Sequence, residues 1–160
     1  MSTDTQPVSR GHSSSGGFDR FCQSLLLLLI RIYFFLQLFK IGRAKLEHID
    51  TVIGYFTKLG VPYPDINAWI VGATECFGGI LIMAGLASRL AAIPVTIAMV
   101  VAYWLGDNDA ALNIWGHPDK FVKAAPFPFF LAALIILCFG PGWFSLDAIL
   151  GRLFRRKREE

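Results

Sequence analysis

Four long apolar segments dominate this sequence and make it too apolar for an ordinary soluble domain. They cover residues 21–39, 68–87, 90–105 and 124–139. A helix that crosses a hydrocarbon core of about 30 Å needs roughly 20 residues, at about 1.5 Å each. Hydrophobic residues make up 54% of the chain, and they come in blocks rather than in the stripes of soluble helices. We therefore predict an all-α polytopic membrane protein, an antiparallel bundle of four transmembrane helices with interfacial amphipathic helices.

The connections between these segments differ in length and character. The link at residues 87–89 is so short that it forces an antiparallel hairpin. Apolar residues recur at helical spacing between residues 46 and 59, which predicts an amphipathic helix in the membrane interface. Residues 145–155 predict a second such helix, with Ser145 as its N-cap. The segment 106–123 is polar and aromatic, and we expect a loop there.

Charged residues predict the domain limits and the orientation in the membrane. We expect a disordered cytoplasmic tail at 1–20, a transmembrane domain at 21–145 and an amphipathic, basic cytoplasmic tail at 146–160. Four spans put both ends on one side, and the basic carboxyl end makes that side cytoplasmic. We expect a multi-pass protein of the plasma membrane with both termini in the cytoplasm. A basic tail beside such spans suits an anionic membrane surface, so no nucleic-acid partner is expected.

Two charged residues interrupt the apolar segments, Arg31 in the first and Glu75 in the second. A charge at the centre of a bilayer costs from about 2.5 to more than 10 kcal/mol, so such residues are usually paired. At 1.5 Å per residue, both lie about 14–18 Å from the predicted cytoplasmic ends. We therefore predict an Arg31–Glu75 ion pair near the midplane. Two interpretations stay open: a staple that fixes helix register, or a polar site for a headgroup, a quinone oxygen or a proton.

Small residues surround the carboxylate in the second segment and predict close helix packing there. These residues are Gly72, Gly78 and Gly79. In the first segment, Gln37 and Lys45 continue the polar character toward the outer face. Lys45 lies on the helical face of Arg31 and would extend a positive path to the interface. The alternative is that Lys45 simply reaches lipid phosphates, together with Lys40 and Arg43.

Neither the cysteines nor the histidine of segment 106–123 indicates a metal or redox centre. Cys22, Cys76 and Cys138 lie within or beside apolar segments without paired spacing, so we expect inert buried thiols. His117 has aspartates near it in sequence, but one histidine in a Gly/Pro-containing segment favours an exposed polar loop, and no metal site is predicted. No phosphate loop or nucleophile triad is recognisable, and no catalytic residue is assigned.

The chain resembles the DoxX family of bacterial four-helix membrane proteins between about residues 25 and 150. The resemblance rests on four motifs in order: Arg31 followed by Gly42–Leu46, the connector Leu59–Pro62, the Glu75 hairpin with Gly78, Gly79, Gly85 and Arg89, and the segment Gly140–Asp147. It implies a component of the bacterial inner (plasma) membrane that is linked to redox chemistry. The family name comes from a subunit of a thiosulfate:quinone oxidoreductase, and relatives are tied to oxidative or thiol stress.

The expected function is a membrane subunit of a quinone-linked redox or oxidative/thiol-stress assembly. Arg31, Glu75, Lys45 and Gln37 would form its polar intramembrane site, with quinone as the ligand and a soluble protein as the redox partner. Any enzymatic activity would be that of an oxidoreductase subunit that depends on this partner. The alternatives are a non-catalytic scaffold that anchors a soluble protein and a small transporter, which would have to be a homo-oligomer.

Overall fold

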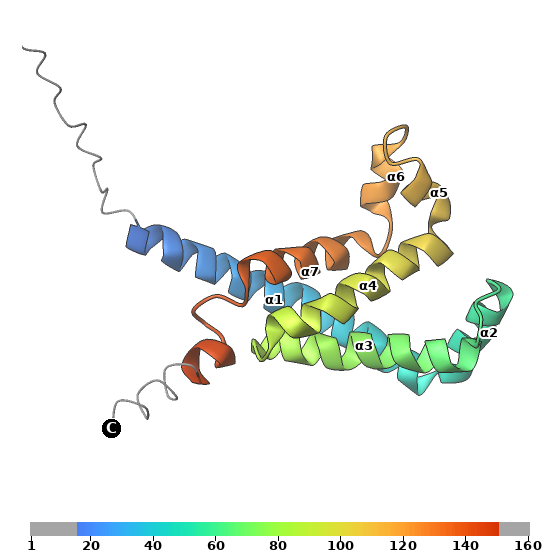
Figure 1. Cartoon of the computed structure of the whole chain (residues 1–160), viewed down its shortest axis with the longest axis horizontal. Coiled ribbons are helices and arrows are strands. Elements are labelled where there is room, and N and C mark those ends of the chain that lie inside the picture. Colours follow the sequence, from blue (N-terminus) through green and yellow to red (C-terminus); the bar gives the residue numbers. More distant parts are fainter. Residues whose placement is uncertain (1–15, 151–160) are drawn as a thin grey trace, which may run out of the picture.

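A computed structural model describes residues 16–150, and every regular element within that range is a helix. In chain order they are α1 (Gly16–Glu47), α2 (Ile49–Lys58), α3 (Pro64–Ala84), α4 (Ser88–Gly106), α5 (Asn108–Leu112), α6 (Pro118–Lys123) and α7 (Phe127–Phe139) (Figure 1). Residues 146–150 are also helical. Most of the predicted disordered tail and the basic residues after 150 lie outside the described residues.

Three of the described helices are long and apolar enough to cross a membrane: α1, α3 and α4. The fourth predicted span corresponds to α7, which has 13 residues. At 1.5 Å per residue that is about 20 Å, less than a hydrocarbon core of about 30 Å. The all-α membrane architecture is therefore confirmed, while helix length supports three spans rather than four.

α1 is longer at both ends than the apolar segment 21–39 predicted. It begins at Gly16 and continues to Glu47, because no proline interrupts the polar residues on either side of the apolar run. α2 then follows after His48 and corresponds to the predicted interfacial helix. None of the α2 residues is buried, and α2 lies across the end of the bundle where α3 begins (Figure 1). The predicted loop at 106–123 contains the short helices α5 and α6.

The tight turn between α3 and α4 is a Schellman motif. Gly85 has φ of 76° and its N–H bonds to the Ile82 carbonyl, while the Leu86 N–H bonds to the Leu81 carbonyl. Glycine adopts this left-handed conformation without the strain that a Cβ brings. The predicted antiparallel hairpin is thus present, with its turn at residues 85–87.

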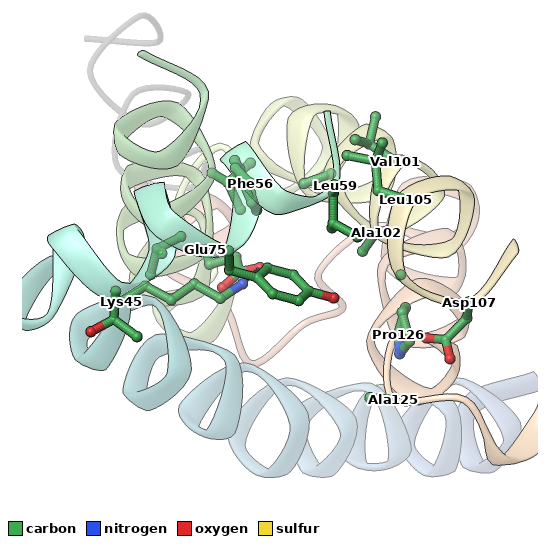
Figure 2. Close-up of a pocket in the computed structure, with 16 residues that line it drawn as sticks. Lys45, Phe56, Leu59, Glu75, Val101, Ala102, Leu105, Asp107, Ala125 and Pro126 are labelled. Atoms are coloured by element: carbon green, nitrogen blue, oxygen red, sulfur yellow. Dashed lines mark hydrogen bonds and ion pairs between the residues drawn. The ribbon is translucent and has the colours of Figure 1, made fainter. Parts of the chain in front are cut away.

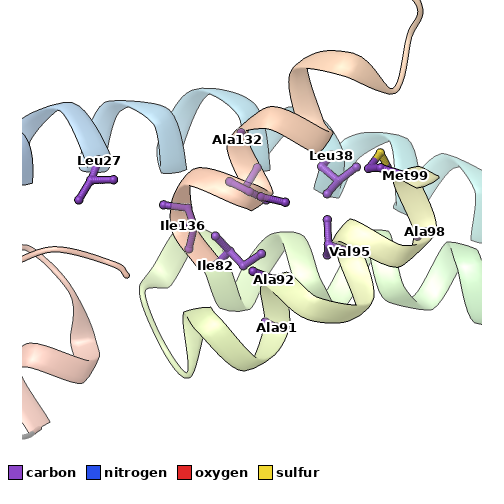
Figure 3. Packing of buried hydrophobic residues seen from close by; sticks show 12 residues of the cluster. Leu27, Leu38, Ile82, Ala91, Ala92, Val95, Ala98, Met99, Ala132 and Ile136 are labelled. Carbon is purple, nitrogen blue, oxygen red and sulfur yellow. The ribbon is translucent and has the colours of Figure 1, made fainter. Parts of the chain in front are cut away.

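The core lies between α1, α3, α4 and α7, and it is built from small and branched residues (Figure 3). Its most deeply buried members include Phe35, Leu38, Ile82, Val95 and Ile136. Many larger apolar side chains on the long helices instead point outward, as expected for helices surrounded by lipid. Examples are Leu26, Leu29, Trp69, Ile70, Phe77, Leu90, Ile97 and Trp104.

Glycines allow α3 to approach both neighbouring helices closely. A Cβ on Gly79 would lie 3.0 Å from the backbone of Phe35 and Phe39 in α1, and one on Gly78 would lie 2.6 Å from the Val95 side chain in α4. Small residues at such crossings replace side-chain bulk with direct backbone contact.

Of the three cysteines, Cys76 is buried in α3, but Cys22 and Cys138 are exposed. The prediction of three buried thiols is therefore wrong for these two, because their helix faces point away from the core.

Candidate functional site

An ion pair between α1 and α3 is the centre of the candidate site. Lys45 Nζ lies 2.6 Å from Glu75 Oε1, and the side chains are 31% and 3% exposed. A charge-assisted hydrogen bond of this kind compensates for much of the cost of removing a carboxylate from water. Glu75 therefore has a cationic partner, as the sequence predicted, but the partner is Lys45 and not Arg31.

The predicted Arg31–Glu75 ion pair is wrong. The Arg31 guanidinium is buried and donates to four backbone carbonyls. Two belong to the last turn of α3, Ile82 at 2.9 Å and Met83 at 3.0 Å. The other two belong to the segment after α7, Pro141 at 2.6 Å and Phe144 at 3.1 Å.

The error came from the helix register. A Cβ on Gly42 would meet the backbone of Glu75 and Cys76, so Gly42 and not Arg31 lies opposite Glu75. Eleven residues of helix separate Gly42 from Arg31, which is roughly 16 Å along the axis. The sequence-based depths of Arg31 and Glu75 were measured from the ends of the apolar runs. They missed the offset between the two residues because α1 extends beyond its apolar run at both ends.

The same register brings Lys45 to the carboxylate. Lys45 is three residues beyond Gly42, and residues at this spacing share one helix face. One turn before Glu75, Gly72 lies against Leu46: a Cβ on Gly72 would be 2.8 Å from the Leu46 side chain. Two glycines on facing helices therefore hold the Lys45 and Glu75 backbones close enough for the side chains to pair.

Beside this ion pair lies a cavity of about 450 Å³ (Figure 2). Lys45 and Glu75 lie at one end, and Asp107 lies at the other, beside Pro126 (Figure 2). The wall between them is apolar and comes from α2, α3, α4 and the residues just before α7. It contains Val52, Phe56, Leu59, Val71, Ala98, Val101, Ala102, Leu105 and Ala125. The volume is in the range of small-molecule sites, which are mostly apolar with a few polar groups.

One oxygen of the carboxylate lacks a hydrogen-bond partner. Glu75 Oε2 is buried and unpaired, and among the described residues only Ser88 Oγ shares this condition. Buried polar atoms are normally satisfied by protein or by ordered water, so each exception requires an explanation. A carboxylate that keeps one free acceptor beside an apolar cavity is suited to receive a hydrogen-bond donor.

The four predicted polar site residues separate into two groups. Lys45 and Glu75 meet at the cavity, whereas Arg31 and Gln37 do not line it. Gln37 is exposed on α1. Arg43, for which the sequence left open an interaction with lipid phosphates, instead pairs with Glu47 at 2.7 Å on the helix surface.

Sequence reasoning missed the contribution of α2 to the cavity. Thr51, Tyr55 and Phe56 line it from this helix, although the segment was predicted only as an interfacial helix. Its apolar face was visible in the sequence. That this face would cover a cavity could not be recognised without the position of α4 across from it.

A second polar cluster closes the opposite end of the bundle, around Arg31. Asp147 accepts hydrogen bonds from the Ala87 N–H at 2.9 Å and from the Ser88 N–H at 3.4 Å, at the start of α4. Ser145 Oγ accepts from the Ala148 N–H at 3.2 Å, which confirms its predicted role as N-cap. The segment 140–147 therefore joins α1, the α3–α4 turn and its own following helix through defined polar contacts.

The match to a protein-family model covers both residues of the ion pair. The DoxX family model matches residues 26–108. An uncharacterized membrane protein of Mycobacterium tuberculosis, Rv3486, is 30% identical over 107 residues, 62% of this chain and 64% of the relative. The protein named "Putative oxidoreductase CatD" of Bacillus subtilis is 28% identical over 75 residues, 47% of this chain and 54% of the relative. The match thus spans less than two thirds of either relative. No solved structure matches.

Proposed function

Because the chain belongs to the DoxX family, we propose that it is the membrane subunit of a quinone-linked redox or oxidative/thiol-stress assembly. The observation that carries the proposal is the cavity beside the Lys45–Glu75 ion pair. The chain's similarity to a protein named as an oxidoreductase supports redox chemistry. The apolar wall of the cavity suits the body of a membrane-soluble molecule, and its charged end suits a polar head.

The ion pair offers both kinds of hydrogen-bonding group that a quinone couple requires. An ammonium group has three N–H donors, and Lys45 uses one of them on Glu75 Oε1. Glu75 Oε2 remains as an acceptor. Lys45 can thus donate to a carbonyl oxygen and Glu75 can accept from a hydroxyl, while the bound molecule would carry the redox chemistry. Neither side chain carries electrons, so we assign electron transfer to a soluble partner.

We also propose that α7 is a fourth crossing, which places both termini in the cytoplasm of a bacterial cell. α7 packs along α4 and is held near both ends of it. Arg89 at the start of α4 donates to the Cys138 carbonyl near the end of α7. Tyr103 near the end of α4 donates to the Phe121 carbonyl in α6, the helix just before α7. A short helix can cross when the bilayer thins locally. The four helices of the bundle would then alternate in direction as an antiparallel bundle in the inner membrane.

The proposed function is tested by quinone binding in lipid nanodiscs. The purified protein is extracted for bound quinone and then titrated with a short-chain ubiquinone. We expect stoichiometric quinone binding in the native protein and its loss in Val101→Trp, because Val101 lines the cavity and the larger ring fills it. Val100→Trp is the matched control, since Val100 is exposed and not part of the cavity wall. Bound phospholipid alone, with no quinone binding on titration, would show that the proposed function is wrong.

A further inference from the structure

The unpaired Glu75 oxygen restricts which molecules the cavity can satisfy. With Lys45 donating to Oε1 at 2.6 Å, the carboxylate still has free lone pairs on Oε2. A carboxylate is an acceptor only. A bound molecule that presents another acceptor to Oε2 leaves this atom unsatisfied and adds repulsion. A molecule that presents an O–H group removes the deficit.

Among the described residues, no side chain of the cavity wall donates to this atom. Thr51 and Tyr55 carry hydroxyl groups and line the cavity from α2, but neither forms a hydrogen bond with the carboxylate. Glu75 Oε2 is itself buried, so a bound molecule reaches it only when neighbouring side chains move. Lys45 is 31% exposed, and its flexible stem can move while the ammonium keeps its contact with Oε1. The donor must therefore come from the bound molecule.

We propose that Glu75 makes this site select the reduced, hydroxyl-bearing form of a quinone couple over the oxidised form. The inference rests on the proposed function and adds a direction to it. The quinol hydroxyl can donate to Oε2, whereas a quinone presents carbonyl oxygens that cannot. Lys45 does not discriminate in the same way, because its ammonium can donate to a carbonyl or to a hydroxyl oxygen.

Glu75→Gln provides a test because it should abolish the preference. The Lys45 ammonium is a donor only, so it orients the glutamine amide with its oxygen toward Nζ. The amide N–H₂ group then occupies the position of Oε2. A donor now stands where an acceptor was, and an amide N–H can donate to a carbonyl or to a hydroxyl oxygen, so the site should no longer select the quinol.

The experiment compares affinities for a short-chain ubiquinone and its quinol, measured anaerobically in nanodiscs. We expect the native protein to bind the quinol about tenfold more tightly, as for one hydrogen bond to a charged group. Tighter binding of the reduced form raises the midpoint potential of the bound couple, by about 30 mV for a tenfold preference in a two-electron couple. Glu75→Gln should abolish both effects. Glu47→Gln, which breaks the exposed Arg43–Glu47 pair, should change neither.

The outcomes separate the two proposals. If neither form binds, the proposed function fails and this inference fails with it. If both forms bind equally, or the quinone binds more tightly to the native protein, only the selection of quinol is refuted. A quinol preference that persists in folded Glu75→Gln also refutes it, because another group must then select. The native comparison decides the matter even when the variant does not fold.

Discussion

The contact of Gly42 with α3 determines whether the ion pair can form, and Gly42→Ala tests it directly. The added Cβ would lie 2.8 Å from the Glu75 carbonyl carbon, and it would also meet the Cys76 backbone nitrogen. Carbon atoms prefer separations of about 3.5–4.0 Å, so α1 must move outward by roughly 0.7–1.2 Å. The contacted atoms are backbone and cannot rotate away. Overpacking of this kind costs about 1–3 kcal/mol, whereas alanine gains about 0.8–1.0 kcal/mol of helix propensity over glycine.

We therefore expect Gly42→Ala to lose about 1–2 kcal/mol of unfolding free energy, since the backbone contact places the cost near the upper end of that range. Gly54→Ala is the control, because Gly54 lies in α2 and a Cβ added there would have no neighbouring atom within 4 Å. It should be unchanged or more stable by up to about 1 kcal/mol. Stability is measured by denaturant unfolding in bicelles, followed by tryptophan fluorescence, and quinone affinity is measured in nanodiscs. Equal stability and equal affinity in the two variants would refute the role of the Gly42 contact.

Two further substitutions test the polar cluster at the other end of the bundle. Arg31→Lys should lower the unfolding free energy by about 2–4 kcal/mol, because an ammonium cannot reach all four carbonyls that the guanidinium holds; Arg20→Lys, on the exposed start of α1, should have little effect, and equal losses in the two would contradict this role. Asp147→Ala removes the acceptor for two N–H groups at the start of α4 and should cost about 1–2 kcal/mol. It should also increase protease cleavage after α7, and unchanged cleavage and stability would show that Asp147 does not hold this segment.

The apolar runs were sufficient to predict the membrane class, the long helices and the hairpin between α3 and α4. Helix length and hydropathy are local properties, so they can be read without knowing what lies across the bundle. The existence of helix α2 and the cap at Ser145 were predicted for the same reason. The ends of α1 were not, because polar residues at membrane boundaries continue a helix as readily as they end it.

The sequence by itself determined that Glu75 needs a cationic partner, because an isolated carboxylate in hydrocarbon is too costly. Only the tertiary structure decided that the partner is Lys45. That choice depends on the register of α1 against α3. The contact of Gly42 with the Glu75 backbone sets this register, although the two residues are thirty-three positions apart in the sequence. The partners of Arg31 could not be predicted either, since they are backbone carbonyls. Every residue carries a carbonyl, so only the fold decides which ones meet the guanidinium.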